Sequence, residues 1–379
     1  MLFYIGFYAK EANIQNRNIV LSATNKMKYI IDAIHKSGIK QEIVSFSSTN
    51  DTRYYPDSFE KINENVYLKQ FKTFGRKNVF TKALDIYFSK LQLFCYLLKN
   101  VKASDTLLVY HSPAYCKEIA FIKKIKKCKL VLEVEEIYGD VSGDKALRKK
   151  ELALCKRADA FVFPTDMLST AVNIYNKPFV TIHGTYQVED DRGCSFNDGK
   201  THIVYAGTFD PRKGGAGAAI GAAEYLSEQY HIHIIGFGSE KQKDDVIQSI
   251  ADINKKSTAA VTYDGLLSGE EYIKFIQSCQ IGLSTQNPSG VYNDTSFPSK
   301  ILSYMANGLR VVSVDIPAVK TSAVGQDLYY YENQTAEEIA NAIMGVNMND
   351  SYNGRKIIAA LDNSFSRDIK KLLEEIHNA

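Results

Sequence analysis

Two segments about eighty residues apart combine glycines, hydroxyls and lysines in a way that suits a phosphate group. The first, 201–215, reads THIVYAGTFDPRKGG, and the second, 293–308, reads NDTSFPSKILSYMANG. Each segment places these residues where a predicted strand or loop meets a predicted helix. Backbone amides at such a junction favour anions, and a lysine adds a compact positive charge. The two segments together predict a site for a nucleotide diphosphate.

The first segment follows a predicted strand that ends at Gly207. Ligands of open α/β sheets bind at the carboxyl ends of the strands, so the loop after Gly207 is a candidate site. Arg212 and Lys213 could neutralise phosphate oxygens, the arginine as a fork and the lysine as a point charge. Gly214 allows a close backbone approach. Taken alone, the loop fits an ordinary connection with surface charges equally well.

The second segment resembles the start of a helix. Ser296 is predicted to cap the helix, and Pro298 suits its first turn because it lacks the amide hydrogen that would stay unpaired there. With Phe297 between them, the amides near Ser299 and Lys300 would then face an incoming anion. An ordinary capped helix is the alternative, and the pairing with the Lys213 loop makes it less favoured.

Two weaker signals follow other predicted strands of the second half. The residues after HIHII include Gly236 and Gly238, and the residues after VTYD are Gly265 and Leu266. Backbone groups at these positions could contact the nucleotide. Plain tight turns explain both patterns at least as well.

The elements that position these residues alternate between short apolar runs and helix-length amphipathic segments. Such alternation predicts an α/β protein with two doubly wound parallel sheets, that is, two Rossmann-like domains. The predicted divisions are an N-terminal domain at 1–183, a polar linker at 184–200, a C-terminal domain at 201–363 and a last helix at 364–379 that packs back on the N-terminal domain. Predicted strands are 2–5, 42–46, 66–71, 106–110, 129–133, 160–163, 179–182, 202–205, 231–235, 260–263, 281–284, 310–314 and 328–330. Predicted helices lie near 17–37, 79–100, 114–127, 143–157, 166–175, 215–228, 239–254, 269–278, 298–307, 335–345 and 365–376.

The order YAGTFDPRKGG, IIGFG, YDGLL and SFPSKILSYMANGLRVVS resembles the nucleotide-sugar domain of retaining glycosyltransferases with the GT-B fold, family four in particular. The likeness is good over 201–315 and weaker over the N-terminal half. It implies two Rossmann-like domains facing a cleft, and transfer of a sugar from a nucleotide donor with retained anomeric configuration. The family needs no metal. Its conserved lysine matches Lys213, and its helix-start phosphate contacts match Ser296–Lys300.

The sequence departs from the family pattern in two places. Thr208 stands where the family usually has an arginine, and Arg212 is the candidate replacement. The family's two glutamates fall on Thr295, beside Asp294, and on Ser303, and the second of them holds the donor ribose in the family. Asp294 and Ser303 therefore join the predicted donor-binding residues, but the loss of both glutamates leaves the donor ribose without its usual partner.

The family places acceptor-binding groups on loops that follow the N-terminal strands. His111 follows the strand TLLVY and is predicted to face the cleft, which makes it a catalytic candidate beside Lys213 and Arg212. A structural role is the more common one for a lone histidine. The predicted acceptor-binding residues are Tyr8, Asn16, Arg17, Asn18, Glu135, Glu136 and Tyr138.

Composition limits the cellular setting. None of the six cysteines forms a CxxC pair, so neither a zinc site nor a disulfide framework is expected, and a reducing cytoplasm is predicted. No run of about 18 apolar residues is present, so no membrane span is expected. The predicted cofactor set is empty, because the nucleotide sugar is a substrate and no metal is required.

The net charge of +3 conceals a difference between the halves. Residues 1–200 carry 31 Lys and Arg against 22 Asp and Glu, whereas the rest carries 15 against 21. The positive charges concentrate at 117–130 and 145–157. They form either solvated helix faces or a surface that attracts an anionic membrane or a lipid-diphosphate acceptor. No motif for nucleic acid accompanies them.

The sequence thus predicts a retaining hexosyltransferase. It would move a sugar from a nucleotide-diphosphate donor, expected to be a UDP-sugar, to a glycan or lipid-linked saccharide in bacterial surface polysaccharide assembly. Two alternatives stay open: a nucleotide-sugar epimerase of the same two-domain form, and a non-catalytic partner that binds a sugar nucleotide.

Overall fold

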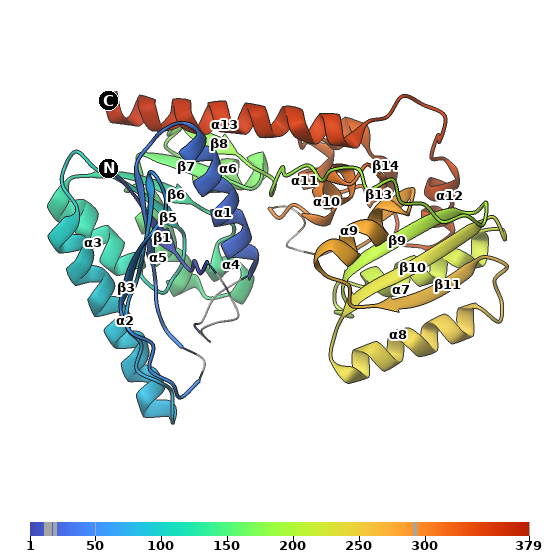
Figure 1. Ribbon diagram of the computed structural model, residues 1–379, viewed down its shortest axis with the longest axis horizontal. Coiled ribbons are helices and arrows are strands. Elements are labelled where there is room, and N and C mark those ends of the chain that lie inside the picture. Colours follow the sequence, from blue (N-terminus) through green and yellow to red (C-terminus); the bar gives the residue numbers. More distant parts are fainter. Residues whose placement is uncertain (11–16, 18–20, 50, 291–292, 294, 379) are drawn as a thin grey trace. The chain divides into compact units, whose positions relative to one another are not determined.

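The structure is a computed structural model that describes residues 1–10, 17, 21–49, 51–290, 293 and 295–378. The chain divides into two compact units. The first comprises Met1–Ile182 together with the chain from Asn363 onward, and the second comprises His183–Asp362. Both are α/β units built on a largely parallel sheet (Figure 1).

The first unit contains an eight-stranded sheet with the order β3-β4-β2-β1-β5-β6-β7-β8. Only β3 runs antiparallel to its neighbour, whereas the other neighbouring pairs of this sheet are parallel. The central strands are apolar and buried on both faces, as expected of parallel strands between helices. The strands are β1 (Leu2–Gly6), β2 (Gln41–Ser45), β3 (Ser58–Asn63), β4 (Val66–Gln70), β5 (Thr106–Tyr110), β6 (Lys129–Glu133), β7 (Ala160–Phe163) and β8 (Phe179–Thr181).

Helices cover both faces of this sheet (Figure 1). Leu93 and Leu97 of α2 join Ile119 and Ile122 of α3 in one core cluster with the strand residues beneath them. The start of α2 is fixed by a capping box between Asn78 and Thr81. The helices are α1 (Leu21–Lys36), α2 (Val79–Asn100), α3 (Cys116–Lys126), α4 (Tyr138–Ser142), α5 (Lys145–Cys155) and α6 (Asp166–Val172).

The second unit contains a six-stranded sheet with the order β11-β10-β9-β12-β13-β14, and all its pairs are parallel. The strands are β9 (Thr201–Thr208), β10 (Tyr230–Phe237), β11 (Ala260–Gly265), β12 (Ile281–Ser284), β13 (Arg310–Val314) and β14 (Tyr329–Tyr331). The helices are α7 (Gly215–Gly221), η1 (Ala222–Tyr225), α8 (Glu240–Ile253), α9 (Gly269–Gln277), α10 (Lys300–Ala306), α11 (Pro317–Lys320), η3 (Gly325–Asp327), α12 (Ala336–Met344) and the first part of α13 (Gly354–Asn378).

The predicted fold class is confirmed, and every predicted strand lies within two or three residues of an observed one. The sequence reading missed β3, whose side chains are mostly exposed, so that it shows no buried stripe with a period of two. Residues 184–200, predicted as a linker, belong to the second unit. Arg192 there bonds to Glu270 and Gln277.

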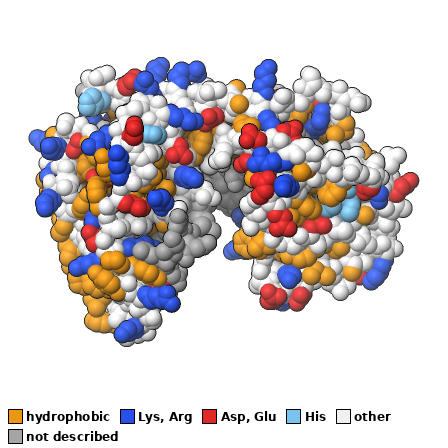
Figure 2. All heavy atoms as spheres, viewed as in Figure 1, with side chains coloured by type: hydrophobic (Ala, Val, Ile, Leu, Met, Phe, Trp, Pro, Cys, Tyr) orange, Lys and Arg blue, Asp and Glu red, His pale blue; other side chains and the backbone are white. Residues whose placement is uncertain are grey.

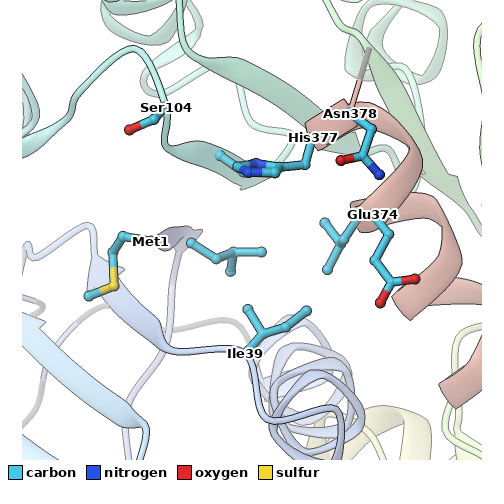
Figure 3. Close-up of a pocket in the computed structure, with 9 residues that line it drawn as sticks. Met1, Ile39, Ser104, Glu374, His377 and Asn378 are labelled. Atoms are coloured by element: carbon cyan, nitrogen blue, oxygen red, sulfur yellow. The ribbon is translucent and has the colours of Figure 1, made fainter.

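The last helix is longer than predicted, because α13 begins at Gly354. Its later part belongs to the first unit, where Phe365 stacks on Tyr29 with ring centroids 5.6 Å apart. The end of the helix borders a cavity of about 270 Å³ at the amino ends of the strands, lined by Met1, Ile39, Glu374 and His377 among others (Figure 3). No helix in the described part of the chain is both long enough and apolar enough to cross a bilayer.

Candidate active site

The carboxyl edge of the second sheet brings several of the predicted glycines together. Gly207 on β9 lies beside Gly236 on β10, and a Cβ atom at Gly236 would lie only 1.8 Å from the Gly207 carbonyl oxygen. Gly236 also has a φ of +141°, which side-chain-bearing residues rarely adopt. Position 236 therefore favours glycine, which leaves the backbone at this edge of the sheet free of side chains.

Two adjoining cavities open at this edge, and Phe237 lines both. The smaller has a volume of about 220 Å³ and an apolar wall. The larger has a volume of about 690 Å³ and is lined mostly by the 208–213 loop and the start of α8. A flat base fits the smaller cavity in size and polarity, and charged groups fit the larger one. The smaller cavity is lined by Ala206, Gly207, Ile235, Gly236, Phe237, Leu266, Leu267 and Tyr272.

The side chain of Lys300 lies at the same carboxyl edge of the second sheet. Its Nζ lies 4.0 Å from the ring centroid of Tyr205 and about 3.0 Å from the position that a Cβ atom on Gly207 would take. Loss of solvation, followed by the positive charge of Lys213, lowers the pKa of Lys300 to about 7. Among the residues that the structure describes, no carboxylate forms an ion pair with Lys300. An anionic ligand at this edge would offset the effect of Lys213 on Lys300.

Lys213 and Arg212 differ although they are neighbours in the loop. Arg212 donates from Nε and Nη2 to the carboxylate of Asp210, and its side chain is 88% exposed. Its charge is therefore already balanced within the loop. Lys213 borders the larger cavity, and its charge is close enough to affect Lys300. The structure thus brings Lys213 and Lys300 together from segments almost ninety residues apart.

The predicted helix start at 296–300 needs a correction. The helix α10 begins at Lys300, and the residue before it, Ser299, already has helical backbone angles and forms no side-chain cap. Ser296 therefore does not cap the helix, and Pro298 precedes the first turn, where its carbonyl accepts a hydrogen bond from the amide of Ile301. Phe297 is buried and stacks on His183 at 4.9 Å.

Ser303, the position of the family's ribose-binding glutamate, lies next to a residue that the sequence reading missed. The Tyr272 hydroxyl lies 3.4 Å from Ser303 Oγ, and Tyr272 also lines the smaller cavity. Burial raises the pKa of Tyr272, so its hydroxyl stays protonated. The hydroxyls of Tyr272 and Ser303 thus lie where the resemblance to the family would place a glutamate carboxylate. The sequence offers no signal for this contact, because Tyr272 lies on a different helix, α9.

The remaining predicted donor residues are spread around the two cavities. Thr208 and Gly238 line the larger cavity, and Leu266 lines the smaller one. Gly214 has a φ of +65° and ends the loop before α7, whereas Gly265 has a φ of +87° at the end of β11. Asp294 lies outside the described residues.

Comparison with known proteins concerns mainly the second unit. A family model described as Glycosyl transferases group 1 matches residues 200–348, which cover both of the cavities described above. These residues therefore form a glycosyltransferase domain, and the whole chain has the GT-B fold. The search of curated proteins found no match to this chain.

Solved structures of the same fold align over the whole chain. The α,α-trehalose 6-phosphate synthase of Burkholderia multivorans aligns with a TM-score of 0.69 and 9% identity, over 99% of this chain and 97% of that one. The E. coli trehalose-6-phosphate protein bound with UDP-2-fluoro glucose gives 0.71 and 9%, over 100% and 99%. The sucrose-phosphate synthase of Thermosynechococcus elongatus gives 0.67 and 12%, over 99% and 98%. At such identities the likeness concerns the fold. None of these three is named for surface polysaccharide assembly.

The first unit contains a second polar cluster at the carboxyl end of β6. Glu133 is fully buried, and Tyr4 donates a hydrogen bond of 2.5 Å to its Oε2. Burial and the charge of Glu135 raise the pKa of Glu133 to about 8. Lys26 donates to Glu135 at 2.6 Å and to the carbonyl of Ile182 at 3.1 Å. Most charges of this cluster are therefore balanced within the unit.

His111 belongs to the same region, but its surroundings fit the structural alternative. Its ring is buried and packs on Tyr138 at 6.0 Å, and its Nε2 lies 3.6 Å from Glu151. Burial lowers the pKa of His111 to about 4, so the ring is neutral at pH 7. Glu136 lies nearby with a pKa that burial raises. The catalytic role of His111 stays a prediction.

The other predicted acceptor residues have structural partners or lie outside the description. The Arg17 guanidinium is buried and donates to the carbonyls of Phe71 and Pro56, at 2.5 and 2.9 Å. Tyr8 is buried, and burial raises its pKa. Asn16 and Asn18 lie outside the described residues. Arg17 therefore contacts the segments at Pro56 and Phe71, whatever further contacts it makes.

Proposed function

We propose that this transferase moves a hexosyl group from a UDP-sugar to a glycan or lipid-linked saccharide, with retention of the anomeric configuration. The observation that carries the proposal is Lys300, a half-buried lysine beside Gly207 with Lys213 nearby. Two positive charges close together raise each other's energy, and a diphosphate between them reverses that penalty. The anion expected at this edge is therefore the donor diphosphate.

The same two lysines would act on the reaction itself. As the bond between the anomeric carbon and the diphosphate oxygen breaks, negative charge grows on the leaving diphosphate. Lys213 and Lys300 are already in place for that charge, and preorganised electrostatic stabilisation is usually the largest catalytic contribution. The departing phosphate oxygen can take the proton of the acceptor hydroxyl, so the proposal needs no separate general base.

The smaller cavity supports a nucleoside beside the diphosphate. Phe237 and Leu266 offer apolar surface for a base, and the hydroxyls of Tyr272 and Ser303 offer hydrogen bonds for a ribose. This pair of hydroxyls would replace the family's glutamate. A neutral pair binds a ribose hydroxyl more weakly than a carboxylate does, because charge-assisted hydrogen bonds are the stronger ones.

The test of the site is Lys213→Ala, with Arg212→Ala as its matched control. Loss of Lys213 removes stabilisation from the leaving group and should lower turnover several hundredfold, about the effect of removing one oxyanion-binding donor. Arg212 is tied to Asp210 at the surface, so its loss should lower turnover less than about fivefold. Donor turnover would be measured by release of UDP. Near-normal turnover of Lys213→Ala, or equal losses in both variants, would contradict the assignment.

Two other functions remain to be separated from transfer. An epimerase would interconvert donor sugars without an acceptor, whereas a binding partner would hold the donor without turnover. Incubation of each UDP-hexose with and without saccharide acceptors, followed by product analysis, distinguishes the three. Transfer is expected to need both donor and acceptor. A new sugar nucleotide formed without acceptor would replace the proposal by the epimerase.

A surface of the first unit supports a lipid-linked acceptor. Phe80, Tyr87 and Leu91 on α2, with Phe121 and Ile125 on α3, leave large apolar side chains exposed, Phe80 at 71%. Figure 2 shows hydrophobic side chains gathered on this part of the molecule, with Lys and Arg beside them. The only carboxylate of α2, Asp85, is buried against Arg76. An apolar face rimmed by lysines has the charge and polarity that suit an anionic bilayer.

Vesicle sedimentation tests this surface. The full chain should bind vesicles that contain phosphatidylglycerol and not vesicles of phosphatidylcholine alone, and binding should weaken with salt. The double variant Phe80→Ser and Phe121→Ser should reduce binding at least tenfold. Ile247→Ser, an exposed apolar position on α8 of the second unit, is the control. Binding that is unaffected by the double variant would place the contact elsewhere.

A further inference from the structure

Three histidines lie together at the amino end of the second sheet. His202 is the second residue of β9, and His231 and His233 stand near the start of β10. Side chains alternate along a strand, so His231 and His233 share one face, and the sheet register pairs His231 with His202. One nitrogen from each ring lies within 4.8 Å of the others. This edge is opposite to the one that holds Gly207 and Gly236.

Two carboxylates fix the orientation of two of these rings. His202 Nε2 lies 2.8 Å from Asp198 Oδ1, and His233 Nδ1 lies 3.0 Å from Asp264 Oδ2. The other nitrogens, His202 Nδ1 and His233 Nε2, point at each other at 2.9 Å. A histidine that binds a metal commonly has its second nitrogen held by a carboxylate in this way. The arrangement therefore provides an outer shell of carboxylates and an inner pair of nitrogens.

The inner pair of nitrogens lies among buried groups. The rings of His202 and His233 are almost completely buried. Phe196 stacks on both, at 4.1 Å from His202 and 5.0 Å from His233. The two inner nitrogens thus lie in a nearly closed place between two carboxylates.

We propose that His202, His231 and His233 bind a divalent transition-metal ion, with Zn²⁺ as the expected ion. The ion would bind His202 Nδ1 and His233 Nε2, and His231 supplies the third nitrogen. Imidazole nitrogens are ligands that Zn²⁺ prefers. Two nitrogens bound tetrahedrally to Zn²⁺ stand about 3.3 Å apart, so the pair has to open by only a few tenths of an ångström.

The proposed ion has a structural role. It joins the starts of β9 and β10 and, through Asp198 and Asp264, secures the chain before β9 and the end of β11. Catalysis at the opposite edge does not pass through it. Loss of the metal should therefore lower the stability of the second unit and leave the affinity for UDP unchanged.

The test uses the full chain without a polyhistidine tag, stripped of metal with a chelator. Calorimetric titration with ZnCl2 should show one ion per chain with submicromolar affinity. Cobalt should give the visible absorption of a tetrahedral nitrogen site. Thermal unfolding should shift upward with Zn²⁺.

The variants separate this site from adventitious binding. His233→Ala should lower Zn²⁺ affinity at least a hundredfold, whereas His377→Gln on the exposed end of α13 should leave it unchanged. His231→Gln changes the least buried of the three positions and serves if His233→Ala fails to fold. Absence of a stoichiometric ion in the wild-type chain, or unchanged affinity in His231→Gln and His233→Ala, would overturn the proposal.

Discussion

Lys300 in the second unit and Glu133 in the first both lie at the carboxyl edge of their sheets and both lose solvation there, but their neighbours differ. Glu133 accepts a hydrogen bond from Tyr4 and lies near the Lys26–Glu135 pair. Lys300 faces the ring of Tyr205 and the positive charge of Lys213. The first environment places opposite charges together, whereas the second brings two lysines close to each other. The proposed site for the diphosphate rests on this difference.

The variant with the largest expected loss of activity is Lys300→Met. The variant keeps the length of the side chain and removes the charge, so we expect donor turnover to fall by about a thousandfold, with weaker binding of UDP. The matched control is Lys320→Met. Lys320 also lies over an aromatic ring, that of Tyr330 at 4.1 Å, but pairs with Asp315. Activity is measured by steady-state kinetics. Equal losses of activity in Lys300→Met and Lys320→Met would contradict the assignment.

A second test concerns the backbone that keeps the donor edge open. Gly236→Ala forces a Cβ atom against the Gly207 carbonyl and should destabilise the second unit by about 1–3 kcal/mol. Gly217→Ala is the control, since a Cβ atom there meets nothing within 4 Å. Thermal unfolding of the two variants measures the change in stability. An unchanged unfolding temperature for Gly236→Ala would show that the two strands can separate without cost.

The pH dependence of UDP binding tests the role of Lys300 in the comparison with Glu133. The pKa of Lys300 is about 7 in the free protein, and a bound diphosphate should raise it. Binding then takes up a proton above pH 7, so UDP affinity should fall by up to about tenfold per pH unit between pH 7 and 9. Calorimetry across this range measures the slope. Lys300→Met should bind weakly with a flatter profile, and an identical slope in that variant would assign the proton elsewhere.

The smallest expected effect concerns Glu133. Its folded pKa of about 8 lies above the unfolded value near 4.5, so the folded state binds the extra proton between these values. This contribution to stability is present at low pH and is lost as pH rises through 8. Glu133→Gln mimics the protonated form and should remove that decline while changing stability little at pH 6.

The ionisation of Lys300 should have the opposite effect on the free energy of unfolding, which should rise between pH 7 and 10.5. Chemical denaturation at several pH values measures both pH dependences.

Much of the donor edge was predictable from local sequence. Gly207 at a strand end, the loop with Lys213 and the lysine before α10 are local patterns with direct physical meanings. The helix boundary was less predictable: Ser296 and Pro298 fit a helix start, but the chain turns into the helix only at Lys300. Good capping residues permit a helix to begin and do not force it, because burial of the neighbouring Phe297 also fixes the path of the chain.

The alternation of strands and helices and the cationic loop were thus determined by the sequence itself, because side-chain periodicity and backbone chemistry act over a few residues. Only the tertiary structure decided which distant groups meet. It placed Lys300 beside Gly207, Tyr272 beside Ser303 and His202 beside His233, and it paired Arg212 with Asp210. Their contacts and charges depend on sheet register and strand order, which bring together residues that are tens of positions apart. No short window of sequence contains that information.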